Sequence, residues 1–291
     1  MSRDIVRPKR YPNPDWQRLC AYGSVRSRFV LTLFAPQGNH VFLGPKSSST
    51  FNDSGNFFQV KYGQGEVAGT IIADNVNIAG LALDQHVFGV ALAETVDFTN
   101  QSLSDGLMGL AQSSLSNQGV LTPVEALAKN GLITEAITSY KLSRVSDGLN
   151  DGEITFGGLD ESKFDSKTLV TLENVSKLGF WEAALTASVN GQNLAINNIT
   201  GILDTGTTLL LLPQADAAAV HAMIPGSRSD GQGGFIIPCT NGAVVSLNFG
   251  GQAFDINPVD ILFAPVDPND LQGDCNSGIV AGQIGGPNQW L

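Results

Sequence analysis

Alternating apolar and polar positions run through the chain and predict short strands joined by turns. The segment FFQVKY, residues 57–62, and the segment EVAGTIIADNVNI, residues 66–78, flank a tip at Gly63-Gln64-Gly65. Period-two alternation rich in β-branched residues on both sides of a glycine turn is typical of a β-hairpin. A third strand is expected in LALDQHVFGVA, residues 81–91. The pattern therefore predicts a hairpin that continues into a further strand.

Two short helices interrupt the strand pattern. One is expected from Thr122-Pro123 to Lys129, because threonine is a good N-cap, proline suits the first helical turn, and Gly131 ends the run. Residues 213–223 predict the other. Further strands are expected in residues 153–160, around Phe180-Trp181 and in residues 202–212. With 33 glycines and 42% hydrophobic residues, the chain is predicted to be all-β with a sizeable core.

The charge excludes some partners. The formal net charge is −11. Nucleic-acid binding is not expected, because phosphate backbones attract basic surfaces. An acidic surface suits a protein that works at low pH, and it suits any soluble protein equally well. No apolar stretch reaches the length of a membrane span, so no membrane partner is expected either.

The uneven distribution of charge indicates a boundary near residue 46. Residues 1–46 hold 8 of the 16 Lys and Arg residues but only two acids, Asp4 and Asp15. We therefore set this basic segment apart from the acidic remainder, and we divide the remainder after Asp165, where the strand pattern starts again. The basic segment lacks the apolar region of a secretory signal, because the run from Phe29 to Ala35 is short and late.

Cysteines and sequons bear on the compartment. Cys239 and Cys275 lie in the glycine-rich C-terminal third and could close a loop, whereas Cys20 lies in the basic segment. A disulfide implies an oxidising compartment. Four N-x-S/T sequons point the same way, at Asn52, Asn100, Asn174 and Asn198. Together they favour a secretory history, against the missing signal.

The strongest chemical signal is Asp204-Thr205-Gly206-Thr207-Thr208. It lies between the apolar runs Ile202-Leu203 and Leu209–Leu212. A carboxylate embedded in such sequence is expected to be largely buried and therefore to need polar partners. The glycine allows a tight turn, and the hydroxyls of Thr205 and Thr207 can bond to the turn or to the acid. The alternative is an ordinary Asx or ST turn between two strands.

Several segments, in order, resemble the pepsin-like aspartic proteases, most closely the secreted fungal acid proteases. DTGTT, residues 204–208, resembles the second catalytic motif of that family. KYGQGEVAG resembles its flap hairpin, with Tyr62 in the place of the flap tyrosine and Gly63 and Gly65 at the tip. DGLMGLA, residues 105–111, resembles the hydrophobic-hydrophobic-glycine motif of the N-terminal lobe. The resemblance covers the chain from about Val41 onward.

The resemblance implies a bilobal all-β fold, truncated at both ends. Residues 1–46 do not match it, residues 47–165 would form a partial N-terminal lobe with the flap, and residues 166–291 would form a C-terminal lobe without its last strands. It also implies a disulfide between Cys239 and Cys275. A monomer acting on proteins or peptides, secreted or vacuolar, without a cofactor or metal, is expected.

The mechanism of this family requires two aspartates, one from each lobe, that share a proton and hold a water molecule. One carboxylate takes the proton of the water while the other protonates the peptide carbonyl. By resemblance, Asp204 would be one partner, Thr205, Gly206 and Thr207 would support it, and Tyr62 would close over the substrate.

The pattern departs from the family at two places. No D-T-G or D-S-G occurs in residues 1–46, where the first catalytic motif belongs. Asp53-Ser54-Gly55 does occur, but polar Asn52 and Asn56 flank it where the catalytic motif needs apolar neighbours, so we interpret it as a surface turn. The chain also stops at Leu291, where the family begins another apolar strand. A lone Asp204 predicts little or no peptidase activity.

Three hypotheses follow. The first is an acid endopeptidase whose sequence is misread at both ends. The second is a catalytically inactive relative that binds peptides or a partner protein. The third is a homodimer that pairs two copies of Asp204, as in retroviral proteases. Other site types have little support, because His40, His86 and His221 lack metal-ligand spacing and no nucleophile elbow, phosphate loop or dinucleotide fingerprint occurs.

Overall fold

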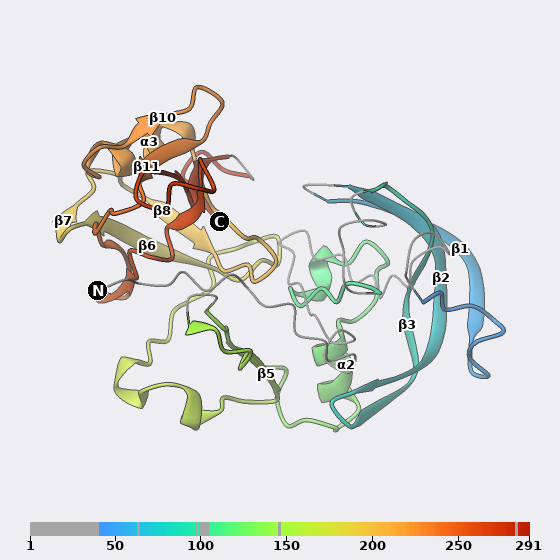
Figure 1. Ribbon diagram of the computed structural model, residues 1–291. Coiled ribbons are helices and arrows are strands. Elements are labelled where there is room, and N and C mark those ends of the chain that lie inside the picture. The colour runs from blue at the N-terminus through green and yellow to red at the C-terminus, as the bar shows by residue number, and fades with distance from the viewer. Residues whose placement is uncertain (1–40, 63–64, 97, 99–104, 145–146, 283–284) are drawn as a thin grey trace. The chain divides into compact units, whose positions relative to one another are not determined.

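The computed structural model describes residues 41–291, apart from 63–64, 97, 99–104, 145–146 and 283–284 (Figure 1). Cys20, Gly63 and Asn100 therefore lie outside the described residues. The chain divides into two compact units, Met1–Lys163 and Phe164–Leu291. Strands dominate both units, which confirms the predicted all-β class. Neither α-helix in the described part of the chain is long and apolar enough to cross a bilayer.

The first unit is built on one antiparallel sheet. Its strands β1 (Asn52–Lys61), β2 (Glu66–Ile78) and β3 (Leu81–Glu94) pair in the order β1-β2-β3, so the predicted hairpin and third strand are confirmed. Alternate residues of β2 face the interior, and Ile72 is fully buried there. At the hairpin tip, the Tyr62 amide donates to the Gly65 carbonyl at 3.0 Å.

Helix α2 (Pro123–Lys129) forms as predicted, with a complete capping box that the sequence analysis did not foresee. The Glu125 amide donates to Thr122 Oγ1 at 3.3 Å, and the Thr122 amide donates to Glu125 Oε2 at 3.0 Å. These two bonds satisfy backbone donors that would otherwise lack partners. Leu127 from this helix is fully buried against Ile78 of β2, so the cap fixes the helix that covers this end of the sheet.

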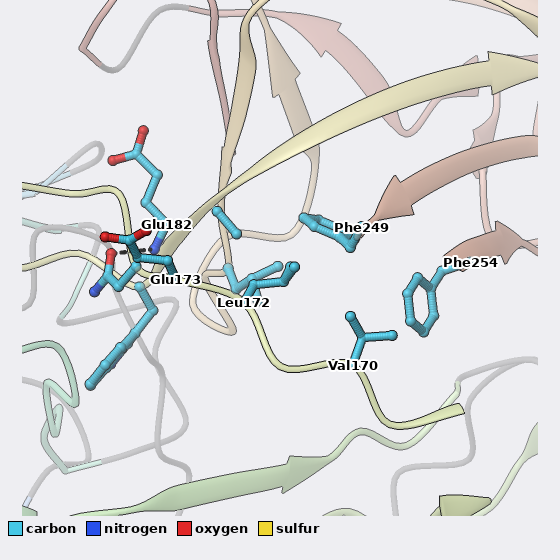
Figure 2. Close-up of a pocket in the computed structure, with 10 residues that line it drawn as sticks. Val170, Leu172, Glu173, Glu182, Phe249 and Phe254 are labelled. Carbon is cyan, nitrogen blue, oxygen red and sulfur yellow. Dashed lines mark hydrogen bonds between the residues drawn. The ribbon is translucent and has the colours of Figure 1, made fainter. Parts of the chain in front are cut away.

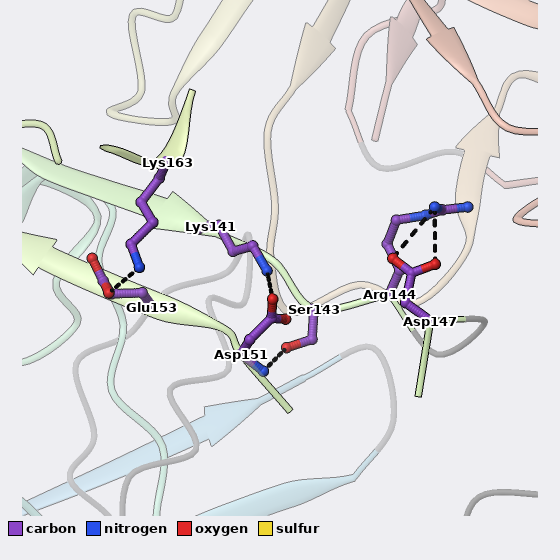
Figure 3. A network of polar contacts seen from close by, with 7 residues as sticks. All are labelled: Lys141, Ser143, Arg144, Asp147, Asp151, Glu153 and Lys163. Atoms are coloured by element: carbon purple, nitrogen blue, oxygen red, sulfur yellow. Dashed lines mark hydrogen bonds and ion pairs between the residues drawn. The ribbon is translucent and has the colours of Figure 1, made fainter. Parts of the chain in front are cut away.

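A short hairpin of β4 (Thr138–Lys141) and β5 (Glu153–Phe156) completes the first unit. Strand β5 is shorter than the predicted run 153–160, because Gly157 turns the chain with a φ of 88°. Its surface ion pairs join Lys141 to Asp151, Lys163 to Glu153 and Arg144 to Asp147 (Figure 3). Exposed pairs of this kind contribute little to stability.

The second unit packs two sheets and a strand pair around one core. The elements involved are β6 (Glu182–Val189), β7 (Gln192–Asn193), β8 (Ile199–Ile202), β9 (Leu210–Leu212), α3 (Gln214–Ala222), β10 (Arg228–Ser229), β11 (Phe235–Pro238), β12 (Val245–Phe249), β13 (Gln252–Ile256), β14 (Leu262–Pro265), β15 (Asp274–Ser277), β16 (Ile279–Ala281) and β17 (Gln289–Trp290). One sheet has the order β13-β12-β6-β8-β17, with β7 paired to β6, and the other has the order β10-β11-β15-β14. A short 3₁₀ turn lies at Ser166–Thr168 of this unit, and two others lie at Ser113–Leu115 and Glu161–Lys163 of the first unit.

The last strand runs between β8 and β9. Strand β17 pairs in parallel with β8, and the Leu291 backbone exchanges hydrogen bonds of 2.8 and 3.0 Å with Leu211 of β9. On its other side, β9 pairs in parallel with β16. The strands at both ends of the segment that connects β8 to β9 are thus held by backbone hydrogen bonds to β17 and Leu291, and β9 is also held by β16.

A disulfide links Cys239 to Cys275, with their Cα atoms 5.0 Å apart, which confirms the pairing implied by the family resemblance. Cys275 lies in β15 opposite Ile237 of β11, and the Cys239 amide donates to the Gly273 carbonyl at 2.8 Å. The bridge therefore fastens the end of β11 to the start of β15.

Candidate active site

Asp204 lies in a turn between β8 and β9 of the second unit. The Gly206 amide donates to Asp204 Oδ1 at 2.9 Å, and Thr207 Oγ1 donates to Asp204 Oδ2 at 2.5 Å. Each carboxylate oxygen therefore accepts a hydrogen bond from within the same turn. Hydrogen bonds of this kind favour the charged carboxylate and hold its two oxygens in a fixed orientation.

One expectation about this turn needs correction. Asp204 is half-buried rather than largely buried, because the chain leaves the sheet after Ile202 and Leu203 is already 65% exposed. Of the two hydroxyls expected to bond to the turn or to the acid, that of Thr207 bonds to the carboxylate. Thr205 lies at the corner of an Asx turn. In such a turn the residues two and three positions after the aspartate come close to its carboxylate, whereas the residue directly after it does not.

The base of the turn is held by backbone hydrogen bonds. The Leu203 amide donates to the Trp181 carbonyl at 2.9 Å, and the Leu210 amide donates to the Gly278 carbonyl at 2.9 Å. Both ends of the turn are thus anchored to neighbouring segments, which presents the carboxylate at a rigid edge where it could act as a catalytic group.

Tyr62, the expected flap tyrosine, lies in the first unit. Its ring is 7% exposed and meets Phe98 edge to face, with ring centroids 5.2 Å apart. Gly65 has a φ of 79°, and a Cβ atom there would come within 2.7 Å of both Thr95 Oγ1 and the Phe98 ring. The hairpin tip therefore requires glycine at position 65.

Asp53 occupies an exposed bulge in β1, where the register shifts before Asn56. Its Oδ1 accepts from Thr70 Oγ1 at 2.7 Å and from the Gly55 amide at 2.9 Å. The hydrogen bond from Thr70, helped by that from Gly55, lowers the pKa of the Asp53 carboxyl. Its exposure and local bonds agree with the surface-turn interpretation, although the turn is a bulge within the strand rather than a turn before it.

Two buried contacts of the second unit were not predicted from the sequence. Trp290 of β17 is 1% exposed, and its Nε1 donates to Asp216 Oδ2 of α3 at 2.7 Å. His221 of α3 is stacked on Phe235, with ring centroids 3.8 Å apart. The sequence signal was available for His221, because it shares a helix face with the buried Ala217 and Val220.

The hydrogen bonds of His221 fix its tautomer. Nδ1 lies 2.7 Å from the Ala217 carbonyl, which can only accept, so Nδ1 carries the proton. Nε2 lies 2.9 Å from Ser277 Oγ, which donates to it and also accepts from the Ile279 amide at 3.1 Å. Because Ile279 pairs with Leu210 of β9, the neutral imidazole supports the strand that follows Asp204.

Acidification is expected to destabilise the protein through His221. Burial lowers the pKa of this imidazole below its ordinary value of 6.5, against a smaller opposing effect of the Ala217 carbonyl. The unfolded chain therefore takes up the proton first, so the stabilisation is complete above pH 6.5 and is lost as the pH falls toward the folded pKa. Urea unfolding at several pH values should show a flatter profile for His221→Gln than for the wild type.

His86 is retained in both proteins of this comparison and therefore serves as the internal control. It is a buried residue of β3, as expected for a strand residue, and burial also lowers the pKa of its imidazole. The difference between the two profiles thus isolates His221. Parallel profiles for the wild type and His221→Gln would contradict the prediction.

A pocket of about 490 Å³ adjoins the strand before Asp204 (Figure 2). Its labelled apolar residues Val170, Phe249 and Phe254 gather at one end, and Glu173 and Glu182 lie at the other. Leu203 contributes to the lining, but Asp204, Gly206 and Thr207 do not. The pocket therefore borders the candidate carboxylate without containing it.

Comparison with known proteins identifies the family of the chain. The sequence model of the eukaryotic aspartyl proteases matches residues 32–290, which begins inside the segment 1–46 that the sequence analysis set apart. The chain is 36% identical over 256 residues to a probable aspartic-type endopeptidase CTSD of Arthroderma benhamiae, covering 87% of this chain and 48% of that protein.

Other fungal relatives give similar values. Rhizopuspepsin of Rhizopus chinensis is 35% identical over 245 residues, covering 82% of this chain and 60% of that protein. Aspartic-type endopeptidase ctsD of Aspergillus fumigatus is 34% identical over 234 residues, covering 80% and 48%. The chain spans about half the length of the first of these curated relatives. By its match over most of its length and by its fungal relatives, this chain belongs to the eukaryotic aspartyl protease family.

Proposed function

We propose that this chain carries one of the two catalytic carboxylates of an aspartic endopeptidase that hydrolyses peptide bonds at acidic pH. The observation that supports the proposal is the turn at Asp204, where Gly206 and Thr207 donate to separate oxygens of one half-buried carboxylate. Hydrogen bonds orient such a carboxylate and stabilise its negative charge. A general base that takes a proton from water requires both.

The proposed reaction needs a second carboxylate. Asp204 takes a proton from the attacking water, and a protonated partner gives a proton to the oxygen of the scissile carbonyl. The tetrahedral intermediate then collapses as the peptide nitrogen is protonated and leaves. A single carboxylate cannot take and give a proton in the same step, so Asp204 alone does not complete the site.

Asp53 is not that partner in this proposal. It carries the other D-S-G sequence, but its carboxylate lies on an exposed bulge and is bonded to Thr70 and Gly55. We therefore propose that the 291 residues by themselves are inactive. The alternative is a non-catalytic, peptide-binding member of the family, and the single D-T-G motif in the sequence favours it.

We propose a monomer in an oxidising compartment, secreted or vacuolar, with proteins or peptides as substrates. The Cys239–Cys275 disulfide supports the compartment, because such bonds persist where thiols are not kept reduced. Family membership supports the substrate class.

The proposal is tested on the protein made from the native transcript, which the hypothesis of a misread sequence expects to encode the second carboxylate that the 291 residues lack. We expect pepstatin-sensitive cleavage of an internally quenched peptide with apolar residues beside the scissile bond, at about pH 4. Asp204→Asn should lower kcat/KM by about 10³-fold or more. Asp53→Asn is the matched control and should retain the activity. Unchanged activity in Asp204→Asn would refute the catalytic assignment. A wild-type protein that shows no pepstatin-sensitive cleavage would favour the binding alternative.

A further inference from the structure

The sequons of this chain differ in how far the fold uses their side chains. At Asn174, Nδ2 donates to the Phe180 carbonyl at 2.8 Å, and Oδ1 accepts from the Ser176 amide at 3.0 Å. The Ser176 hydroxyl also accepts from the Phe180 amide at 3.2 Å. Both groups that define this sequon are therefore part of the folded structure, and a sugar on Nδ2 would oppose the bond to Phe180.

Asn198 presents the opposite case. It lies in the exposed bend just before β8, with a φ of 57°, a backbone conformation that asparagine tolerates better than most residues. Within the described part of the chain, its side chain makes no hydrogen bond. The same holds for the hydroxyl of Thr200, the third residue of the sequon. Neither group is committed to the fold.

Asn52 lies between these two cases. Its side chain is exposed at the start of β1, where the residue pairs with Ala73. The hydroxyl of Ser54, however, donates to the Ile71 carbonyl at 2.6 Å and accepts from the Asn56 amide at 3.1 Å. The fold thus uses half of this sequon. Asn100 lies outside the described residues.

We propose that Asn198 carries an N-linked glycan and that Asn174 does not. In the transfer, Nδ2 of Asn198 forms a bond to the anomeric carbon of a lipid-linked oligosaccharide, the lipid pyrophosphate leaves with the bonding electrons, and the amide loses one proton. The Cys239–Cys275 disulfide supports passage through the oxidising compartment in which such donors are used.

The position of Asn198 also leaves the candidate active site open. Asn198 and Asp204 flank opposite ends of β8, a strand of four residues that spans roughly 13 Å. A glycan at Asn198 would extend into solvent from the end of the strand away from the Asp204 turn. Asn174, in contrast, lines the pocket that Trp181 and Leu203 also line, and a glycan there would fill the space. The proposal does not depend on peptidase activity.

The test is a peptide map of the full chain made in yeast behind a cleavable secretory leader. Both secreted and retained protein are collected, so that retention does not hide the result, and N-glycans are released with peptide N-glycosidase F in ¹⁸O-water. We expect ¹⁸O-labelled aspartate at position 198 in most molecules and unlabelled asparagine at position 174. Disulfide-bonded protein with unmodified Asn198, or with a glycan on Asn174, would overturn the proposal.

A matched pair of variants at Thr200 tests the assignment without touching Asn198. Thr200→Val removes the sequon hydroxyl but keeps the branched shape that suits β8, whereas Thr200→Ser keeps the sequon. We expect the ¹⁸O label at position 198 to disappear in the first variant and to persist in the second. Equal labelling in both would refute glycan transfer at this sequon.

Discussion

The purified 291-residue chain is expected to cleave a quenched peptide at about pH 4 no faster than its Asp204→Asn variant. The reason is the balance of protons. Asp204 is bonded to Gly206 and Thr207 through its two oxygens, which suits a base but leaves no acid for the carbonyl. Against an enzyme with both carboxylates, the expected loss is about 10³-fold or more in kcat.

The measurement compares the chain, Asp204→Asn and Asp53→Asn at matched concentrations, each with and without pepstatin. Thiol titration checks that the Cys239–Cys275 disulfide of the second unit is intact in each sample. Equal, pepstatin-insensitive background rates are expected in all three. Pepstatin-sensitive cleavage that Asp204→Asn abolishes would contradict the prediction, and its loss in Asp53→Asn as well would assign the second carboxylate to the bulge of β1.

The elements that the sequence predicted well are those with a local cause. The hairpin of β1 and β2 follows from period-two alternation around Gly65, whose positive φ needs a glycine. Helix α2 follows from Thr122 and Pro123, which fix its start irrespective of what it packs against. The turn at Asp204 was predicted because glycine and hydroxyl residues after an aspartate form a turn through local hydrogen bonds.

The details that the sequence did not predict depend on contacts between distant segments. The burial of Asp204 was overestimated because apolar neighbours show that β8 and β9 are buried, not where the chain leaves the sheet between them. The bond between Trp290 and Asp216 joins residues 74 positions apart, and no local pattern reveals such a pair. The contact between His221 and Ser277 joins residues 56 positions apart and is hidden from local patterns in the same way.

Trp290→Ala is expected to lower the free energy of unfolding by about 3 to 5 kcal/mol, the range for removing a buried aromatic side chain. Trp290 is among the largest fully buried side chains and packs in the core of the second unit. Its loss leaves a cavity and leaves the buried Asp216 carboxylate without its indole donor, which adds a desolvation cost. Guanidinium unfolding followed by far-ultraviolet circular dichroism measures the effect.

Two further variants separate packing from hydrogen bonding. Trp290→Phe keeps much of the volume but removes the indole N–H, so we expect a loss of about 1 to 3 kcal/mol. Asp216→Asn keeps an acceptor for Trp290 Nε1 and should cost less than Trp290→Phe. If Trp290→Phe were as stable as the wild type, the buried hydrogen bond would carry no net stabilisation.

The same residue is expected to control the order of the candidate active site. Trp290 pairs with Gly201 of β8, and Leu291 bonds to Leu211 of β9, so one strand holds both sides of the Asp204 turn. Loosening β17 by Trp290→Ala should therefore raise the hydrogen-exchange rate of the Gly206 amide, which donates to Asp204.

The Ala126 amide of α2, which bonds to the Thr122 carbonyl in the first unit, is the internal control, and its exchange rate should not change. Equal acceleration at both amides would show global unfolding instead, and no change at Gly206 would show that the turn orders itself without β17.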